Sequence, residues 1–261
     1  MNRILGVRCW VIGVRCWVIG VGCWMLALSA HADDFLSDLT IGGRVGYSLG
    51  ATTPIGIPAT IREINSFKPT FNLSVGVDVR KPLGDQWGVL TGLRIENKGM
   101  DAAVTTKGYH MEMVKGGESL EGLYTGRVEQ QVRQWMLTLP LALTLNLGQD
   151  WQLRAGPYVS LLVDKEFSGN VSNGYLRKDN PTGPKIEMGD APDERATYDF
   201  SDQMRSWQTG LLVGAQWRFA ERWGLAADLS WGLTGVMRSS FTTVEQTLYP
   251  IYGTIAITYE F

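Results

Sequence analysis

The chain has 261 residues, of which 31 are glycine and 10% are aromatic. Its 24 basic residues nearly balance its 26 acidic residues, so there is no positive excess of the kind that binds nucleic acid. An apolar fraction of 44% argues against long disorder. After the N-terminal leader, the sequence contains no run of about 18 apolar residues, the length that a helical membrane span requires.

The first 32 residues have the features of a secretory signal peptide. Arginines at positions 3, 8 and 15 accompany an apolar run from Cys16 to Leu28, and Ala30-His31-Ala32 matches a small-residue cleavage site. A membrane anchor is the alternative, but the run is short for a span. We therefore expect residues 33–261 to form the mature domain. All three cysteines precede it, which argues against disulfides, thiol catalysis and zinc clusters.

The mature chain alternates short and long polar connections. Short turns precede Trp87, Trp151 and Trp223, whereas long polar stretches cover about 51–67, 100–130, 167–205 and 238–246. The segments between them predict eight strands, at about 39–50, 68–80, 87–99, 131–147, 151–166, 206–219, 223–237 and 247–261. This arrangement is typical of an all-β, antiparallel, up-and-down transmembrane β-barrel. Ten strands are the less favoured alternative, if loop 167–205 adds a hairpin.

Side-chain alternation within these strands favours a membrane barrel over a soluble one. From Trp135 to Leu147 every odd-numbered residue is apolar. No odd-numbered position is charged within the strand segments 39–49, 69–79, 87–97, 135–147, 151–163, 207–219, 223–233 and 249–261. The even-numbered positions, which must then face the lumen, carry Arg44, Asp78, Arg94, Glu96, Arg154, Arg218, Asp228 and Glu260. An eight-stranded barrel is just wide enough to be filled by its own side chains, so we expect a plug of salt bridges. An ion path or proton relay is the alternative.

Aromatic residues lie near both ends of the predicted strands. They are Trp87, Trp151, Trp223 and Tyr259 near the short turns, and Trp135, Trp207, Trp231 and Tyr249 near the long loops. Tyr249 and Tyr259 are ten residues apart, which spans about 25 Å in a tilted strand, the height of an apolar membrane band. We expect two lipid-interface girdles in contact with the bilayer and lipopolysaccharide.

The chain ends on an aromatic residue, Phe261, on the same face of the last strand as Ile257 and Tyr259. A terminal aromatic after an alternating strand resembles the signal that the outer-membrane assembly machinery recognises. An exposed strand edge with a hydrophobic row can pair with the open edge of that machinery. We therefore predict that Phe261 is an assembly signal.

Three segments resemble the PorT-type outer-membrane β-barrel domain: Lys98-Gly99-Met100, Trp135 to Leu143, and Leu153 to Tyr158. The resemblance covers about 39–261, and the family is similar in architecture to the small OmpX and OmpA barrels. It implies a barrel in the outer membrane of a Gram-negative bacterium. It implies no shared catalytic site, and some relatives serve in protein secretion or gliding.

Catalytic chemistry has little support in this sequence. Barrel enzymes generally need a histidine beside a serine or an acid. The mature chain has one histidine, His110, with Glu118 and Ser119 nearby in sequence, and we interpret it as a solvated loop residue. We expect no catalytic site, cofactor or metal. Tyr175, Tyr198 and Phe200, on the loop 167–205, suggest a partner surface.

Two function classes remain. Segments 100–113 and 121–134 flank Gly116-Gly117, which predicts a hairpin of strands protruding beyond the membrane, with an edge for a partner strand. The favoured function is a structural or binding barrel whose outer loops contact lipopolysaccharide, a surface glycan or another protein, within a surface or secretion assembly. The alternative is a pore for small or hydrophobic solutes, which a lateral opening or an internal tunnel would favour.

Overall fold

The computed structural model describes residues 38–178, 180–241, 243 and 246–261. Within them, Thr40–Phe261 forms one compact unit. The predicted signal peptide, residues 1–32, lies outside the described residues. In the part of the chain that the structure describes, no helix is long and apolar enough to cross a membrane.

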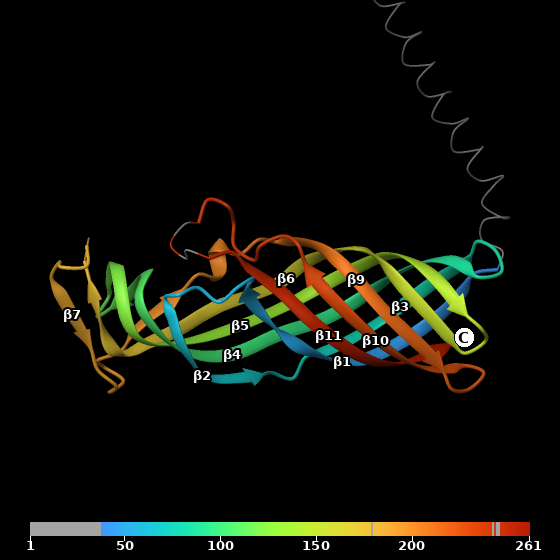
Figure 1. The fold of residues 1–261 in the computed structure, drawn as a ribbon, viewed down its shortest axis with the longest axis horizontal. Helices are drawn as coiled ribbons and strands as arrows, with labels where there is room; N and C mark the ends of the chain where they lie inside the picture. Colours follow the sequence, from blue (N-terminus) through green and yellow to red (C-terminus); the bar gives the residue numbers. More distant parts are fainter. Residues whose placement is uncertain (1–37, 179, 242, 244–245) are drawn as a thin grey trace, which may run out of the picture. The chain divides into compact units, whose positions relative to one another are not determined.

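Eight antiparallel strands close into a ring (Figure 1). They are β1 (Thr40–Pro54), β3 (Leu73–Pro82), β4 (Trp87–Lys115), β5 (Glu118–Leu147), β6 (Trp151–Arg177), β9 (Trp207–Arg218), β10 (Trp223–Gly232) and β11 (Leu248–Glu260). Pairing of β1 with β11, from Gly42 opposite Glu260 to Pro54 opposite Leu248, completes the ring. The predicted eight-stranded, up-and-down barrel is confirmed.

The ten-stranded alternative is wrong. The segment 167–205 does contain two further strands, β7 (Lys185–Met188) and β8 (Ala196–Asp199), but neither enters the ring. β7 pairs with the outer end of β6, and β8 pairs with β6 and touches β4 at Val114. β6 and β9 already pair with each other from Trp151 to Leu161, so the membrane part of the wall has no place for an added hairpin.

The β4–β5 hairpin extends far beyond the membrane-spanning part of the barrel. The two strands have 29 and 30 residues, whereas about 9–11 residues cross a bilayer. They stay paired as far as Lys115 opposite Glu118. Gly116 and Gly117 form the turn with φ of 61° and 88°, values that glycine adopts without steric cost. The predicted protruding hairpin is therefore confirmed.

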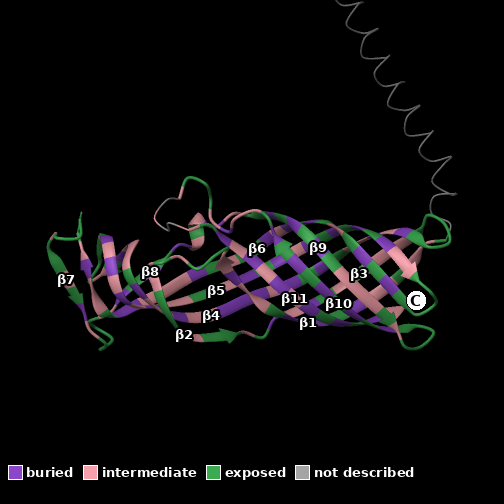
Figure 2. Cartoon of the chain, viewed as in Figure 1, coloured by how far each residue is buried: buried purple, intermediate pink, exposed green. Residues whose placement is uncertain are grey.

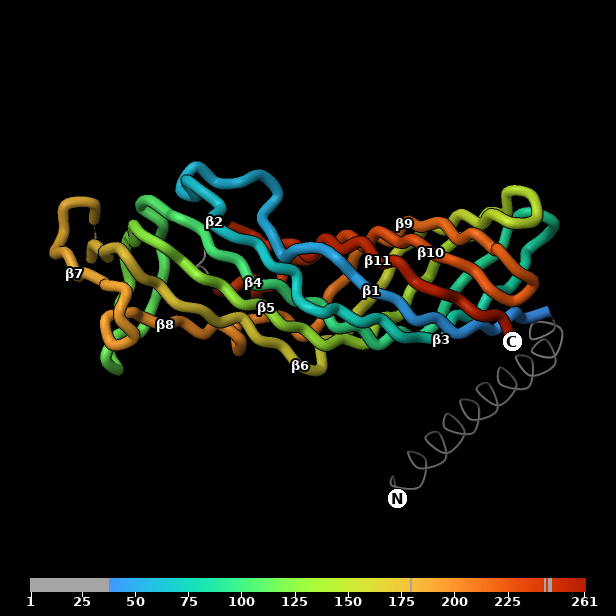
Figure 3. Tube along the Cα trace, turned by 90° about the horizontal axis from the view of Figure 1, so that it is seen from below, coloured from blue at the N-terminus to red at the C-terminus, as the bar shows by residue number. Residues whose placement is uncertain are grey.

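The predicted loop 51–67 is partly strand, which corrects the sequence prediction. β1 continues to Pro54, and β2 (Ile61–Pro69) pairs with β4 from Thr106 to Met100. β2 lies in line with β3 on the same edge of β4, because the extended β4 offers backbone donors and acceptors beyond the end of β3. Figure 3 shows the β1–β2 connection standing out from the side of the barrel.

Burial alternates along the membrane-spanning strands as the two-residue period requires (Figure 2). Val45, Leu229 and Ile257 are exposed on the outer surface, whereas Ser48, Ala226 and Thr258 are buried inside. An outer face this apolar is stable against lipid rather than water.

The outer extension, which we define as residues 61–69, 100–134 and 163–204, has an apolar interior of its own. Met113, Tyr124 and Val171 are fully buried in this core. The O–H of Tyr124 donates to the carbonyl of Ser172 at 2.7 Å, and the O–H of Tyr198 donates to that of Glu129 at 2.9 Å. Burial raises the pKa of both hydroxyls above the ordinary tyrosine value.

Two of the aromatics expected on a partner surface lie in this core instead. Tyr198 and Phe200 are 5% and 7% exposed and stack on each other and on Phe167. They are buried because the closing of β8 onto β6 turns them inward. Tyr175 is partly exposed, beside the ammonium of Lys185 at 4.5 Å.

Candidate functional site

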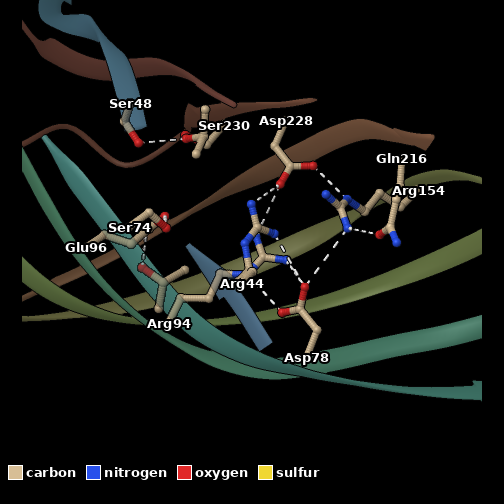
Figure 4. Close-up of polar contacts among 12 residues, drawn as sticks. Arg44, Ser48, Ser74, Asp78, Arg94, Glu96, Arg154, Gln216, Asp228 and Ser230 are labelled. Carbon is tan, nitrogen blue, oxygen red and sulfur yellow. Dashed lines mark hydrogen bonds and ion pairs between the residues drawn. The ribbon is translucent and has the colours of Figure 1, made fainter. Parts of the chain in front are cut away.

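Five charged side chains meet in the lumen, and we call them the charge cluster (Figure 4): Arg44, Asp78, Arg94, Arg154 and Asp228. They come from β1, β3, β4, β6 and β10, and each holds an even, inward position. Arg44 Nη2 lies 2.7 Å from Asp228 Oδ2, and Arg154 Nε lies 2.6 Å from Asp228 Oδ1. Arg94 binds Asp78 through Nε and Nη2, both at 3.1 Å.

Glu96 lies in a second group, where it pairs with a residue that the sequence analysis missed. Lys98 Nζ is 3.1 Å from Glu96 Oε2, and both side chains are buried. The hydroxyl of Thr138 donates to the same carboxylate oxygen at 2.7 Å. Lys98 follows Glu96 by two residues, so extending the alternation by one more position would have placed it inside the barrel.

Arg218 and Glu260, the last two predicted lumen residues, do not join the cluster. They lie at the short-turn end, where Arg218 Nη2 is 3.5 Å from Glu260 Oε1 and the side chains are 33% and 23% exposed. A recess of about 400 Å³ lies at this end, lined by Arg80, Gln216 and Arg218 among others. The eight predicted residues thus divide into the charge cluster, a buried Glu96–Lys98 pair and a partly solvated pair.

The charge cluster leaves little free space. The three guanidinium groups lie between the carboxylates of Asp78 and Asp228, and the arginine side chains are at most 2% exposed. A remaining cavity beside the cluster, bordered by Arg94, Glu96 and Asp228, has a volume of about 10 Å³. That is about the volume that one water molecule requires. At this level the lumen is packed rather than open.

The predicted girdle residues are outward-facing. Trp87, Trp151 and Trp223 are 52%, 51% and 47% exposed, and the other members, Trp135, Trp207, Trp231, Tyr249 and Tyr259, are exposed or partly exposed. Phe261 packs edge-on against Tyr259, with ring centroids 5.5 Å apart. Its N–H donates to the carbonyl of Ile41 at 3.0 Å, which ties the chain end to β1.

On the outer hairpin, His110 and Ser119 contact different acidic residues. His110 Nε2 lies 3.5 Å from Glu121 Oε1, at the protein surface. The hydroxyl of Ser119 donates to Glu112 at 2.7 Å. Among the described residues, no group of three or more histidine, cysteine, aspartate or glutamate side chains could hold a metal ion.

An apolar cavity of about 170 Å³ lies above the charge cluster, inside the outer extension. Met100, Val104 and Val128 line its wall, and Phe167, Tyr198 and Phe200 close it on the side of the long loops. Its remaining side is formed by residues 51–54 of β1 and by Ile61, Ile64 and Phe67 of β2.

The barrel wall is open at this remaining side. Among the described residues, β1 pairs with β3 as far as Tyr47 opposite Leu73, and the N–H of Ser48 then donates to the carbonyl of Asn72 at 2.8 Å. Beyond this bond β1 pairs with β11 alone. β2 pairs with β4 and not with β1. Two strand edges therefore face each other without a ladder of hydrogen bonds. This opening was not predictable from the sequence, because it arises from the divergence of two chain segments after residue 48.

The model of one protein family, described as outer membrane protein beta-barrel domain, matches residues 30–238. The chain belongs to this family. Membership agrees with the eight-stranded ring and the apolar outer face, and it implies residence in the outer membrane. No curated protein matches the sequence.

Several solved outer-membrane barrels are similar in structure. The attachment invasion locus protein Ail of Yersinia pestis, in complex with the heparin analogue sucrose octasulfate, has 9% identity and a TM-score of 0.36, covering 85% of this chain and 99% of that chain. Neisserial surface protein A has 8% identity and a TM-score of 0.38, covering 86% and 98%. OprG from Pseudomonas aeruginosa has 13% identity and a TM-score of 0.31, covering 85% and 94%.

Proposed function

We propose that this protein is a non-enzymatic outer-membrane barrel with a closed lumen, which acts by binding through its outer extension. The observation that carries the proposal is the charge cluster. Arg44, Arg154 and Asp228 join β1, β6 and β10 across the lumen, and their side chains are at most 3% exposed. Opening a water path would separate these charges, and an unpaired buried charge is costly.

The outer extension is suited to present a binding surface. Its core ties β4, β5, β6 and β8 together, so the long hairpin is held in place rather than solvated on all sides. Charged side chains such as Lys185 and Glu187 lie on its outside. The partner classes that fit such a surface are lipopolysaccharide, a glycan or another surface protein. We also retain a PorT-type affiliation and export by a cleaved signal peptide as parts of the proposal.

Single-channel recording in planar bilayers tests the closed lumen. We expect the purified barrel to give no stable openings, because the cluster fills the cross-section. The double variant Asp78→Ser/Arg94→Ser removes two oppositely charged side chains of the cluster together and should produce measurable current, which shows that the assay detects an open lumen. Stable porin-sized openings in the unmodified protein would refute the proposal.

Crosslinking in intact cells, followed by mass spectrometry, tests the binding role. Crosslinks should concentrate on the outer extension, for instance at Lys115 and Lys185, and not on Lys81 at the short-turn end. Crosslinks confined to the short-turn end would contradict binding through the outer extension.

The alternative, transport of hydrophobic solutes, is favoured by one observation. The apolar cavity above the cluster adjoins an opening in the barrel wall. An axial path from this cavity to the short-turn end would have to cross the charge cluster, so a lateral exchange with the membrane is the route that the geometry favours.

A further inference from the structure

We propose that the apolar cavity binds a medium-chain alkyl amphiphile, with a single oxygen-bearing head, that enters from the outer leaflet between β1 and β2. This inference deepens the proposed binding function, on which it rests, by naming a ligand class. It concerns the interior of the outer extension rather than its outer surface.

The size and chemistry of the cavity fit one short alkyl chain. Its volume is about 170 Å³, and methionine, valine, isoleucine and phenylalanine side chains form most of the wall. An apolar protein cavity of about 150 Å³ stays dry and holds a molecule as large as benzene. A chain with a similar number of carbon atoms therefore fits, whereas a complete membrane lipid does not.

Among the described residues, side chains cover the cavity in both axial directions. On the long-loop side, Tyr198 and Phe200 stack with ring centroids 5.3 Å apart, and Phe200 packs on Phe241 at 4.9 Å. On the other side, Met100 is followed by the buried Lys98–Glu96 pair and then by the charge cluster. A ligand must therefore enter through the side.

The side opening has an exposed apolar rim. Ile57, Ile64 and Phe67 line the cavity and are 63%, 56% and 46% exposed. Two further exposed aromatic residues, Tyr47 and Phe71, have ring centroids 5.6 Å apart, and Phe71 follows Phe67 by four residues. Exposed apolar side chains grouped in this way would be unfavourable in water and are stable in contact with acyl chains. The opening therefore faces the compartment in which alkyl amphiphiles dissolve.

A polar side chain in the cavity wall specifies the head of the ligand. Gln130 lines the cavity, and its Nε2 is buried without a hydrogen-bond partner among the described residues. The neighbouring hydroxyl of Thr106 already donates to the carbonyl of Gly126 at 3.3 Å. A buried donor without an acceptor is costly, and a carbonyl or carboxylate oxygen of a ligand would satisfy it.

Photolabelling of the barrel in lipid nanodiscs tests the inference. Nanodiscs contain no detergent, whose alkyl chains would compete with the probe for the cavity. The probe is hexanoic acid with a diazirine near its methyl end, added to the full barrel, and labelled residues are mapped by mass spectrometry. We expect labels on inward residues around Met100, Val104 and Val128. Excess unlabelled hexanoic acid should remove them.

Matched variants separate cavity binding from labelling by the surrounding lipid. Ala102→Trp fills the cavity and should reduce these labels about tenfold, whereas Val213→Trp adds the same bulk on the lipid-facing wall and should change nothing. Gln130→Leu should weaken competition by hexanoic acid about tenfold, the effect of one hydrogen bond, while competition by hexane is retained. Heat-modifiable migration on gels checks that each variant is folded, and Val104→Phe replaces Ala102→Trp if that variant does not fold.

Labels confined to lipid-facing residues, or equal labelling of Ala102→Trp and Val213→Trp, would overturn the inference. If the labelling fails in this way but the barrel does not conduct, the inference about the cavity is wrong and the proposed closed lumen still holds. Porin-like conductance, by contrast, would remove the proposed function whatever the labelling pattern.

Discussion

Arg154 and Asp228 join two strands that are not neighbours in the barrel wall. Nε of Arg154 on β6 donates to Oδ1 of Asp228 on β10 at 2.6 Å, across the intervening strand β9. The two side chains are 0% and 3% exposed, so little water screens the pair. Since Asp228 also binds Arg44 at 2.7 Å, one carboxylate connects three parts of the wall.

Replacing this carboxylate should strongly destabilise the barrel. Asp228→Asn leaves Arg44 and Arg154 without their nearest anionic partner, and we expect the free energy of unfolding to fall by about 3–5 kcal/mol. Urea unfolding of the barrel in lipid vesicles measures the change. The matched control is Asp190→Asn, which breaks an exposed pair with Arg195 and should cost less than about 1 kcal/mol. Equal losses in the two variants would contradict a structural role for the cluster.

The turn of the outer hairpin should depend on glycine at position 117. Its φ of 88° disfavours branched side chains, so Gly117→Val should loosen the tip by about 1–2 kcal/mol. Gly117→Asn is the control, because asparagine tolerates this backbone region. Hydrogen exchange of the amides near Lys115 and Glu118 reports the effect. Unchanged protection in Gly117→Val would mean that the turn is not strained by a side chain.

Limited proteolysis of intact cells should distinguish the two longest outer segments. We expect trypsin to cut within 167–205, after the exposed Lys178, before it cuts within 100–130. At the hairpin tip, Lys115 is paired with Glu118, and its Nζ donates to the carbonyl of Glu187 at 2.6 Å. Equally rapid cutting of both segments would show that the hairpin is not held by the contacts described above.

Alkaline pH should loosen the outer extension before the membrane-spanning ring. The pKa values of Tyr124 and Tyr198 are raised in the folded state by burial. Below the ordinary tyrosine pKa of about 10 both states are protonated and the stabilisation is complete. Above it the unfolded state releases its protons first, so stability falls as pH rises toward the folded pKa.

Tyrosinate absorbance and near-ultraviolet circular dichroism, recorded together during an alkaline titration, measure this loss. Tyr198→Phe should make the stability of the outer extension less dependent on pH, because one of the two buried hydroxyls is removed. A pH dependence identical to that of the unmodified protein would exclude Tyr198 as a contributor.

Deletion of Phe261 should impair assembly more than stability. Its side chain is 75% exposed, so the deletion removes at most about 1.5–3 kcal/mol of apolar burial. We expect less protein in the outer membrane and more periplasmic aggregate or degradation, with the inserted fraction still heat-modifiable. Leu147→Ala, on the lipid-facing side near the short turns, is a control for lost apolar surface. Normal outer-membrane levels without Phe261 would refute the assembly signal.

The sequence by itself determined the ring of eight strands and the orientation of its side chains. A membrane barrel must present apolar residues to lipid at every second position, and this period is visible from Trp135 to Leu147 without any knowledge of partners. The same period placed Arg44, Arg154 and Asp228 inside. The paired glycines at 116 and 117 marked the hairpin turn, because their conformation is a local property.

Only the tertiary structure decided which inward charges meet and where the wall opens. Arg44 and Asp228 are 184 residues apart in sequence, and strand stagger around the closed ring sets their distance. Arg218 and Glu260 hold equivalent inward positions, yet the stagger leaves them near water. Likewise, the cavity depends on β2 pairing with β4 rather than with β1. Local alternation fixes the face on which a side chain lies, whereas its neighbours on that face follow from the register of strands distant in sequence.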